Sequence, residues 1–216
     1  MQPRTYIDFF VTIPERGPGT NALAHNTVGV LFKFVHAIAA NIGFAYGAAF
    51  PKAKVGDRVT TGDVVRIFAH DRSNLDELAD RIEAQPFAKR FLKIGRIKTV
   101  EDADILGYVE YLRFRIPNRK SRLQESRERR MDEADEYPYI NLTSSTGHDM
   151  TLRIKPIFHA TEKCEDAFSP EITASFQPDI YGLSVFERRF ALPVFEDDTV
   201  VKSIKRNIAM QVMRPS

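Results

Sequence analysis

The chain has 216 residues, of which 43% are hydrophobic, and it carries a net charge of only +2 at neutral pH. That length and composition provide for one large domain or two small ones with real hydrophobic cores. The single cysteine, Cys164, excludes an intrachain disulfide and a cysteine-based zinc site. A chain with one thiol fits a reducing compartment, so we expect a cytoplasmic protein.

Neither a membrane span nor a signal peptide is expected. The N-terminus runs directly into a strand-like pattern. The most apolar stretch, residues 28–50, is interrupted by Lys33, His36, Asn41 and several glycines. These interruptions favour a helix followed by a strand over a membrane span.

Four segments at the start of the chain have the composition of β-strands: residues 5–13, 42–50, 63–69 and 91–100. Two predicted helices lie between them. Apolar residues recur at helical spacing over residues 26–41, and Gly43 closes that helix. Ser73, with Asp76 three residues later, forms a capping box that predicts a helix as far as Ala84.

The resulting order of elements is β-α-β-β-α-β, which is the split βαβ, or ferredoxin-like, arrangement. We therefore predict the α+β class, with a ferredoxin-like N-terminal domain over residues 1–104 and a second domain over residues 105–216. Many RNA-binding modules use this arrangement, but so do many unrelated proteins, so it does not decide the function.

The second half of the chain is predicted to contain a long strand, a basic helix and a hairpin. The strand covers residues 105–116, and the helix covers about 118–132 with Asn118 as its N-cap. The hairpin pairs residues 139–143 with residues 150–158. A polar linker, three short strand candidates and a tail with helical spacing follow: residues 160–169, 171–176, 180–184, 189–195 and 196–216.

Positive charge is concentrated between Arg113 and Arg130. Eight of these eighteen residues are basic and two are acidic, so the segment carries +6 and the rest of the chain −4. Advancing about 100° per residue places six of the bases on one half of the predicted helix. They are Arg119, Lys120, Arg122, Arg127, Arg129 and Arg130.

A helix of this kind has little apolar surface to bury, so packing is not its main purpose. One-sided positive charge on an otherwise mildly acidic chain points to a polyanionic partner. Arginine in place of lysine favours bidentate contacts with phosphates and base edges. The alternative is a solvated helix held by pairs such as Glu125 with Arg129.

The sequence contains no phosphate-binding glycine loop, no His-Glu-x-x-His motif, no nucleophile elbow and no dense carboxylate cluster. A metal-dependent nuclease would usually show several acids placed to hold Mg²⁺. We therefore expect no metal and no cofactor.

Among the five histidines, His36 stands out by its position. It lies about 110° from the centre of the apolar stripe on the first predicted helix, at the border of the buried face. There a side chain can face a groove, and a histidine is suited to acid–base chemistry near neutral pH. The alternative is a half-buried histidine whose ring is satisfied by a backbone group.

Two further groups could take part in chemistry. Ser144, Ser145 and Thr146 form a hydroxyl cluster beside Gly147, which is either ordinary turn chemistry or a set of positioning hydroxyls. Tyr181 lies in the short motif Tyr-Gly-Leu-Ser and would by itself be a strand aromatic.

Together and in this order, these segments resemble the CRISPR RNA-processing endoribonucleases of the type I-F branch. The similarity extends over roughly residues 6–195. Its segments are residues 31–36 (LFKFVH), 42–51, the strand with Arg113 and Arg115, 144–147 with 152–154, and 181–184 with 192–195. No single motif is specific, but their order and spacing are.

The resemblance implies an enzyme that binds the hairpin of the CRISPR repeat and cuts once at the 3′ base of the stem, without metal. The upstream ribose 2′-hydroxyl attacks the scissile phosphate, which leaves a 2′,3′-cyclic phosphate and a 5′-hydroxyl. The enzyme then keeps its product, as a single-turnover protein. It is monomeric within the type I-F surveillance complex, whose backbone and other subunits are its protein partners.

Residue roles follow from the same resemblance. His36 would transfer the proton of the 2′-hydroxyl, one of Thr143, Ser144 or Ser145 would position that hydroxyl, and Tyr181 would orient His36. Arg113 and Arg115 would read base edges low in the stem, while the basic helix lines its groove. Met150 stands near the place where the family usually has an aromatic that stacks on the stem.

Two other functions stay open at this stage. One is a non-catalytic RNA-hairpin-binding subunit of a ribonucleoprotein, which would have no need of a histidine at the edge of a groove. The other is a ferredoxin-like protein-interaction domain, which leaves the one-sided arginines unexplained.

Overall fold

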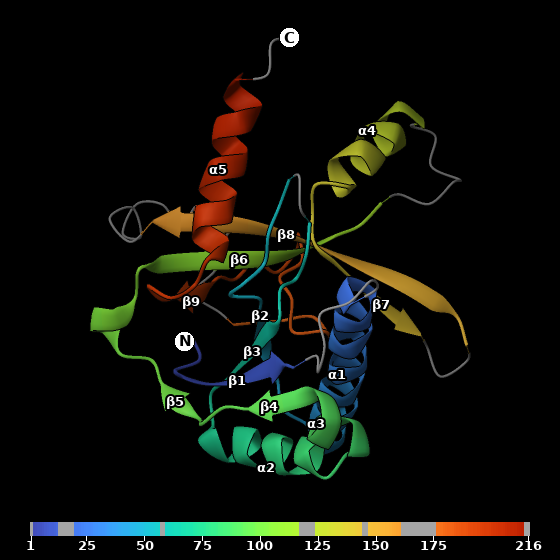
Figure 1. Cartoon of the computed structure of the whole chain (residues 1–216). Coiled ribbons are helices and arrows are strands. Elements are labelled where there is room, and N and C mark those ends of the chain that lie inside the picture. Colours follow the sequence, from blue (N-terminus) through green and yellow to red (C-terminus); the bar gives the residue numbers. More distant parts are fainter. Residues whose placement is uncertain are drawn as a thin grey trace.

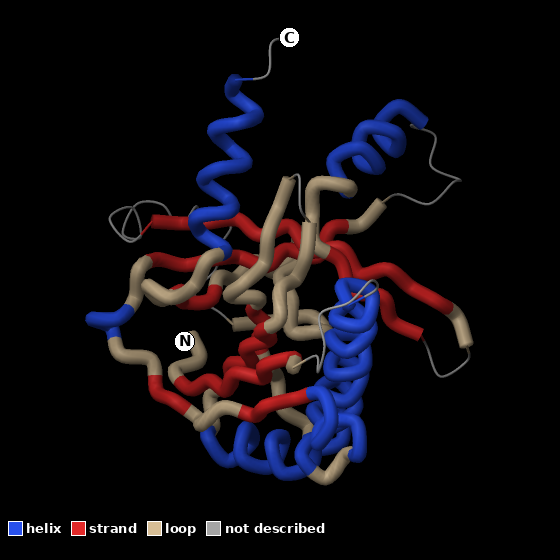
Figure 2. The backbone as a smooth tube through the Cα atoms, viewed as in Figure 1, coloured by secondary structure: helices blue, strands red, loops and turns tan. Residues whose placement is uncertain are grey.

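The structure, a computed structural model, describes residues 2–12, 20–56, 59–116, 124–143, 147–160 and 176–213. The chain belongs to the α+β class, and its strands form two antiparallel sheets that share one hydrophobic core (Figure 1). Figure 2 shows the strands in the middle of the molecule, with helices around them and two helices projecting from one end.

The first sheet has the strand order β2-β3-β1-β4, with β5 also paired to β1. Its strands are β1 (Thr5–Val11), β2 (Gly47–Ala49), β3 (Val64–Ala69), β4 (Leu92–Ile94) and β5 (Lys98–Thr99). Every pair is antiparallel. All residues of β3 are buried, as its nearly continuous apolar run indicates.

Three helices accompany this sheet: α1 (Thr20–Ile42), α2 (Arg72–Glu83) and α3 (Pro86–Phe91). The first two pack against each other and against β1. The predicted first helix is confirmed, although it begins at Thr20 and includes Ile42, which was expected to be extended. Of the segment 42–50, only Gly47–Ala49 is a strand.

The predicted capping box at Ser73 is wrong. The N-cap of α2 is Asp71, in an extended conformation, and it makes no side-chain capping hydrogen bond. Ser73 therefore lies within the first turn. The carboxylate of Asp76 is instead 3.7 Å from Arg72, one turn earlier on the helix surface.

The predicted single strand over residues 91–100 is also wrong. Its start belongs to α3, and the remainder is divided into β4 and β5. Phe9 pairs with Ile94, whereas Tyr6 pairs with Lys98, so the edge contains one residue more than β1 between the two pairs. That extra residue is the mark of a β-bulge, which breaks the ladder of this edge strand.

The second sheet has the strand order β7-β8-β6-β9. Its strands are β6 (Gly107–Phe114), β7 (Tyr139–Thr143), β8 (Asp149–Ala160) and β9 (Leu192–Val194). The predicted hairpin is confirmed as β7 and β8. The helices α4 (Gln124–Ala134) and α5 (Val200–Met213) project from the same side of this sheet (Figure 1).

The tail predicted to have helical spacing is the helix α5, and its first turns dock on the body. Val200, Val201 and Ile204 are buried there, while Ile208 is 56% exposed farther along. Of the predicted strand 189–195, Leu192–Val194 forms the strand β9. The predicted strand 171–176, except its last residue, and most of the predicted linker lie outside the described residues.

Aromatic and glycine contacts join the two sheets. Phe50, which follows β2, stacks on Phe32 of α1 at 5.5 Å and meets Tyr111 of β6 edge-on at 5.6 Å. At Gly29 the backbone of α1 approaches β7 so closely that a Cβ atom would lie 2.3 Å from the carbonyl oxygen of Asn141. The core is continuous between the sheets, and a domain boundary near residue 104 stays a prediction.

A buried ion triad ties the C-terminal segment to the first sheet. Arg66 of β3 donates to Asp8 of β1 at 2.6 and 3.2 Å, and to Asp198, just before α5, at 2.9 Å. Its guanidinium lies against the stacked pair of Tyr6 and Phe195, 4.7 and 4.8 Å from their ring centroids. Burial raises the pKa of Asp198. Burial lowers the pKa of Arg66, but the hydrogen bond to Asp8 and the charge of Asp198 outweigh it, and the net pKa is raised.

We predict that Arg66→Ala lowers the free energy of unfolding by about 3–5 kcal/mol, because it leaves two buried carboxylates without a counter-charge. Urea unfolding at neutral pH measures the loss. The matched control is Arg4→Ala, which removes an exposed 2.7 Å pair with Asp102 and should change stability little. Equal effects of the two substitutions would contradict the structural role of the triad.

Candidate active site and nucleic-acid interface

His36 lies on α1, half-buried, and contacts a loop that is distant in sequence. Its Nδ1 donates a hydrogen bond to the carbonyl oxygen of Ile180 at 2.8 Å. A carbonyl can only accept, so Nδ1 carries the proton, and the neutral ring has its lone pair on Nε2. The alternative prediction, a histidine whose ring is satisfied by a backbone group, therefore holds for Nδ1. The other nitrogen, Nε2, can still act as a base.

A second ring donates to the same carbonyl oxygen. The hydroxyl of Tyr46 lies 3.1 Å from the oxygen of Ile180. Tyr46 is almost fully buried, and burial raises its pKa, so the phenol is a neutral donor at physiological pH. Two fixed donors from the first half of the chain therefore hold one carbonyl of the second half.

Tyr181 lies beside His36, as the sequence predicted. The two ring centroids are 5.5 Å apart and the planes are tilted by 41°. The hydrogen bond that orients His36 comes from the backbone of Ile180, one residue earlier, and Tyr181 adds a ring contact. The role of Tyr181 in orienting His36 stays a prediction. The structure adds the carbonyl of Ile180 as a second group that orients the ring.

The loop of residues 178–184, hereafter the 178–184 loop, is organised by one carboxylate. Asp179 accepts hydrogen bonds from the backbone N–H groups of Tyr181 at 2.8 Å and Leu183 at 3.0 Å. Gly182 has a positive φ of 73°, and a Cβ there would lie 2.6 Å from the ring of Tyr46. These constraints form a tight turn, so the predicted strand over residues 180–184 is wrong.

Arg113 of β6 completes the attachment of this loop. Its Nη1 lies 3.2 Å from Asp179, and its guanidinium lies 5.1 Å from the ring centre of Tyr181. Only 17% of the side chain is exposed. The contact with base edges that the sequence suggested for Arg113 stays a prediction, while its observed contacts are those of a positioning residue.

The end of the loop is held by a second buried carboxylate, Glu110 of β6. Ser184 donates to it at 2.6 Å, and Arg189 donates twice, at 2.9 and 2.6 Å. His159 lies 3.7 Å away, at the distance of an ion pair. Burial raises the pKa of Glu110, but its contacts with His159, Arg189 and Ser184 outweigh this and bring the pKa to about 2.

His36 also lines a shallow cavity of about 320 Å³ between the end of α1 and the 178–184 loop. Lys33 lies one turn before His36 on α1 and is exposed. Residues three apart on a helix are neighbours, so its ammonium group is placed to reach an anion bound near His36. Sequence reasoning did not assign Lys33, although this spacing was a usable signal.

The predicted hydroxyl cluster is described only in part. Thr143, at the end of β7, donates to Asp149 across the hairpin at 2.8 Å, so its hydroxyl proton is engaged there. Ser144 and Ser145 lie outside the described residues, so their roles stay predictions. Met150 is half-buried on β8 and packs against the core.

The predicted basic helix is confirmed from Gln124 onward as α4, which ends at Ala134. Arg127, Arg129 and Arg130 belong to it, whereas the other predicted bases of the helix lie outside the described residues: Arg119, Lys120 and Arg122. Arg129 and Arg130 are exposed. Arg130 donates to the carbonyl oxygen of Arg115 at 2.9 Å, so the helix base is attached to the end of β6.

A groove of about 460 Å³ lies between the base of α4, β6 and the turn after Ser184. Arg115, Arg130 and Lys155 line it, with Lys155 paired to Glu133 at 2.6 Å. Phe186 also lines it and is 82% exposed, the highest exposure among the large hydrophobic residues described. An exposed ring beside cations is a platform on which a nucleobase can stack.

Sequence reasoning missed Phe186. The residue lies between the predicted strands 180–184 and 189–195, next to Glu187 and Arg188, and nothing in its local pattern indicated an exposed ring. Only the bridge between Val185 and Arg188, which turns the chain back, places Phe186 at the tip of a turn.

Within the described part of the chain, no group of three His, Cys, Asp or Glu side chains is placed to hold a metal ion. Among the helices described, none is long and apolar enough to cross a membrane. In comparisons with known proteins, no family model matches this chain and no curated protein matches it.

We predict that the stability of the protein depends on Glu110 between pH 4.5 and about 2. The folded-state pKa is depressed from 4.5 to about 2, so the stabilisation is complete above pH 4.5 and is lost as the pH falls toward 2. In Glu110→Gln, the drop in unfolding free energy over this range should be smaller by about 3 kcal/mol.

Denaturant unfolding of both proteins at pH 7, 4.5 and 2.5 measures this difference. The control is Glu187→Gln, which removes an exposed carboxylate from the neighbouring turn and should leave the pH dependence as in the wild type. The same pH dependence in the wild type and in Glu110→Gln would contradict the assignment.

Proposed function

We propose that this protein is a CRISPR RNA-processing endoribonuclease of the type I-F branch. It binds the hairpin of the CRISPR repeat, cuts at the 3′ base of the stem without a metal ion, and stays bound to the crRNA within the surveillance complex. The observation that carries the proposal is the fixed ring of His36. Its Nδ1 lies 2.8 Å from the carbonyl oxygen of Ile180, and the ring of Tyr181 lies beside it.

The chemistry requires a base with a free lone pair. In the proposed step the 2′-hydroxyl oxygen attacks the scissile phosphorus, and its proton passes to Nε2 of His36. The bond from phosphorus to the 5′-oxygen breaks, and that oxygen takes up a proton. The products are a 2′,3′-cyclic phosphate and a 5′-hydroxyl, and one of Thr143, Ser144 or Ser145 positions the attacking hydroxyl.

We also infer that the first sheet and its helices form a ferredoxin-like unit. The strand order β2-β3-β1-β4, with antiparallel neighbours, supports this inference. In this proposal the two halves have different roles. The helix α1 supplies His36, whereas the half that contains the second sheet supplies the 178–184 loop and the cations that contact the RNA.

Substrate binding is assigned to the basic surface around α4. Arg115 and Arg130 border a groove with the exposed ring of Phe186, and Arg129 is exposed on the same helix. Guanidinium groups bind phosphates and base edges in planar, bidentate geometry, which suits the recognition of an RNA stem. Retention of the product follows from the same contacts, because cleavage does not remove them.

A non-catalytic subunit that only caps the RNA hairpin is the second candidate function. The observation that favours it is the hydroxyl of Thr143, which is engaged with Asp149 and not with His36. A catalytic role therefore requires the hairpin turn to present a hydroxyl from Ser144 or Ser145, or Thr143 to exchange partners when RNA binds.

We predict that His36→Ala lowers single-turnover cleavage of the cognate repeat RNA by at least about 100-fold, because a proton-transfer group is lost. Its affinity for the RNA, measured by fluorescence anisotropy, should stay within about twofold of wild type. EDTA should leave wild-type cleavage intact, and a 2′-deoxy residue upstream of the scissile phosphate should block it.

The control variant is His70→Ala, which removes an exposed histidine at the end of β3. It should cleave at the wild-type rate. Full activity of His36→Ala would exclude the catalytic assignment, and binding without cleavage by the wild type would favour the hairpin-capping alternative.

We further predict that neutralising Arg119, Arg122 and Arg129 together weakens RNA binding and flattens its salt dependence. Each lost phosphate contact should reduce the slope of log K against log salt by about 0.7–0.9. Titrations at several salt concentrations measure the slope. An unchanged slope would contradict phosphate contacts by the basic helix.

A further inference from the structure

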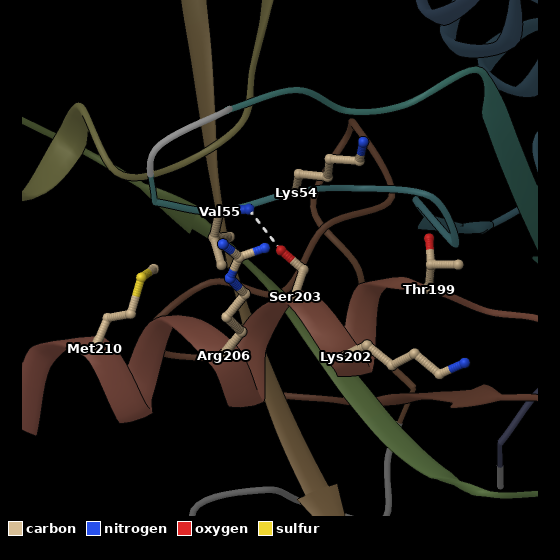
Figure 3. A pocket seen from close by; sticks show the side chains of 7 residues that line it. All are labelled: Lys54, Val55, Thr199, Lys202, Ser203, Arg206 and Met210. Carbon is tan, nitrogen blue, oxygen red and sulfur yellow. Dashed lines mark hydrogen bonds between the residues drawn. The ribbon is translucent and has the colours of Figure 1, made fainter.

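A second cationic site lies on α5, away from the groove at α4. A cavity of about 670 Å³ lies between α5 and the segment before β3. Figure 3 shows the side chains that line it. Lys54 borders it from that segment, and Lys202 and Arg206 border it from the helix. Neither the candidate active site nor the resemblance to the endoribonucleases accounts for it.

The walls of this cavity are held by hydrogen bonds between distant parts of the chain. The backbone N–H of Val55 donates to the hydroxyl of Ser203 at 3.0 Å, the contact drawn in Figure 3. The N–H of Val200 donates to the carbonyl of Pro51 at 3.0 Å. Lys52 donates to the carbonyl of Asp197 at 2.5 Å. The cations are therefore displayed on a rigid frame.

The positive charge around the cavity favours the binding of an anion. Lys202 and Arg206 are four residues apart on one face of α5, where like charges are mutually destabilising. Lys54 faces the same space, and no Asp or Glu is among the described residues that line it. All three cationic side chains are exposed. Three positive charges around one hollow, with no carboxylate among its described lining residues, form an attractive site for phosphate groups.

The position of the cavity relates it to the RNA surface. Glu136, two residues beyond the end of α4, accepts from the backbone N–H of Gly56 at 3.0 Å. Its side chain lies 3.5 Å from the side-chain nitrogen of Asn207 on α5. The segment beside the cavity is thus in contact with the base of α4, and both helices project from the same side of the molecule (Figure 1).

We propose that this cavity binds phosphates of the single-stranded RNA that flanks the hairpin. This assignment rests on the proposed function, in which α4 holds the hairpin itself. The lining residues that the structure describes include hydroxyls and cations but no aromatic ring, so we expect contacts with the RNA backbone that carry no sequence preference. The flanking strand would run from the groove at α4 past the base of that helix to α5.

The test compares three RNAs: the hairpin alone, the hairpin with a single-stranded flank, and a single strand without a hairpin. The variant is Lys54→Ala/Lys202→Ala/Arg206→Ala. The control is Lys89→Ala/Arg90→Ala/Lys93→Ala, which removes the same number of exposed lysines and arginines from α3 and β4, at the other end of the molecule. Affinities are measured by anisotropy at several salt concentrations.

The cavity variant should bind the flanked hairpin about tenfold more weakly than wild type, with a salt slope flatter by about 2. Its affinity for the hairpin alone should be unchanged, and the control should match wild type on all three RNAs. Circular dichroism and the midpoint of urea unfolding establish that the variant is folded.

Two results would overturn the proposal: equal wild-type affinity for the hairpin with and without its flank, or a cavity variant that binds the flanked RNA as wild type does. Binding of the single-stranded RNA distinguishes failure of the cavity assignment from failure of the proposed hairpin-binding function. If the protein ignores the hairpin but its binding of the single strand is weakened by the cavity variant, the cavity is an RNA site and the hairpin assignment is wrong.

Discussion

The charge on Arg66 is the constraint on which the arrangement of the two halves depends. A guanidinium in the interior needs a counter-charge and acceptors for its N–H groups, and here two carboxylates supply both, one from β1 and one from the segment before α5. A buried charge left without its partner is costly, so the start of α5 cannot leave the first sheet without exposing or stranding the triad. The triad thus fixes the start of α5. The segment of Val55 and Gly56 then contacts α5 on one side and Glu136, just beyond α4, on the other.

The candidate active site is likewise shared between the halves. His36 belongs to the helix of the first sheet, whereas the group that holds it belongs to a loop fastened to β6. Two carboxylates do the fastening: Asp179 gathers the turn and pairs with Arg113, and Glu110 secures Ser184. A histidine held in this way loses rotational freedom before any substrate arrives, which is the preorganisation that proton transfer requires.

Much of the fold could be predicted because its signals are local. The apolar spacing around Phe32 predicted α1, and the polar turn between two alternating segments predicted the hairpin of β7 and β8. The failures arose where a distant partner decides the local conformation. Hydrogen bonds to Asp179 hold residues 180–184 in a turn, although their composition is typical of a strand. The bulge opposite β1 interrupts residues 91–100, whose sequence predicts one continuous strand. The position of His36 was predictable, but its partner, 144 residues away, was not.

The hydrogen bond to Ile180 has a consequence for genetics. The acceptor is a main-chain oxygen, and every amino acid supplies one. The side chain of Ile180 is 61% exposed, so its replacement would leave the acceptor in place. A mutational scan of the chain would therefore record this position as tolerant, although its carbonyl selects the tautomer of the histidine. Chemistry directed at the main chain, such as replacement of the amide between residues 180 and 181 by an ester, would weaken that oxygen as an acceptor and would also remove the N–H of Tyr181 that donates to Asp179.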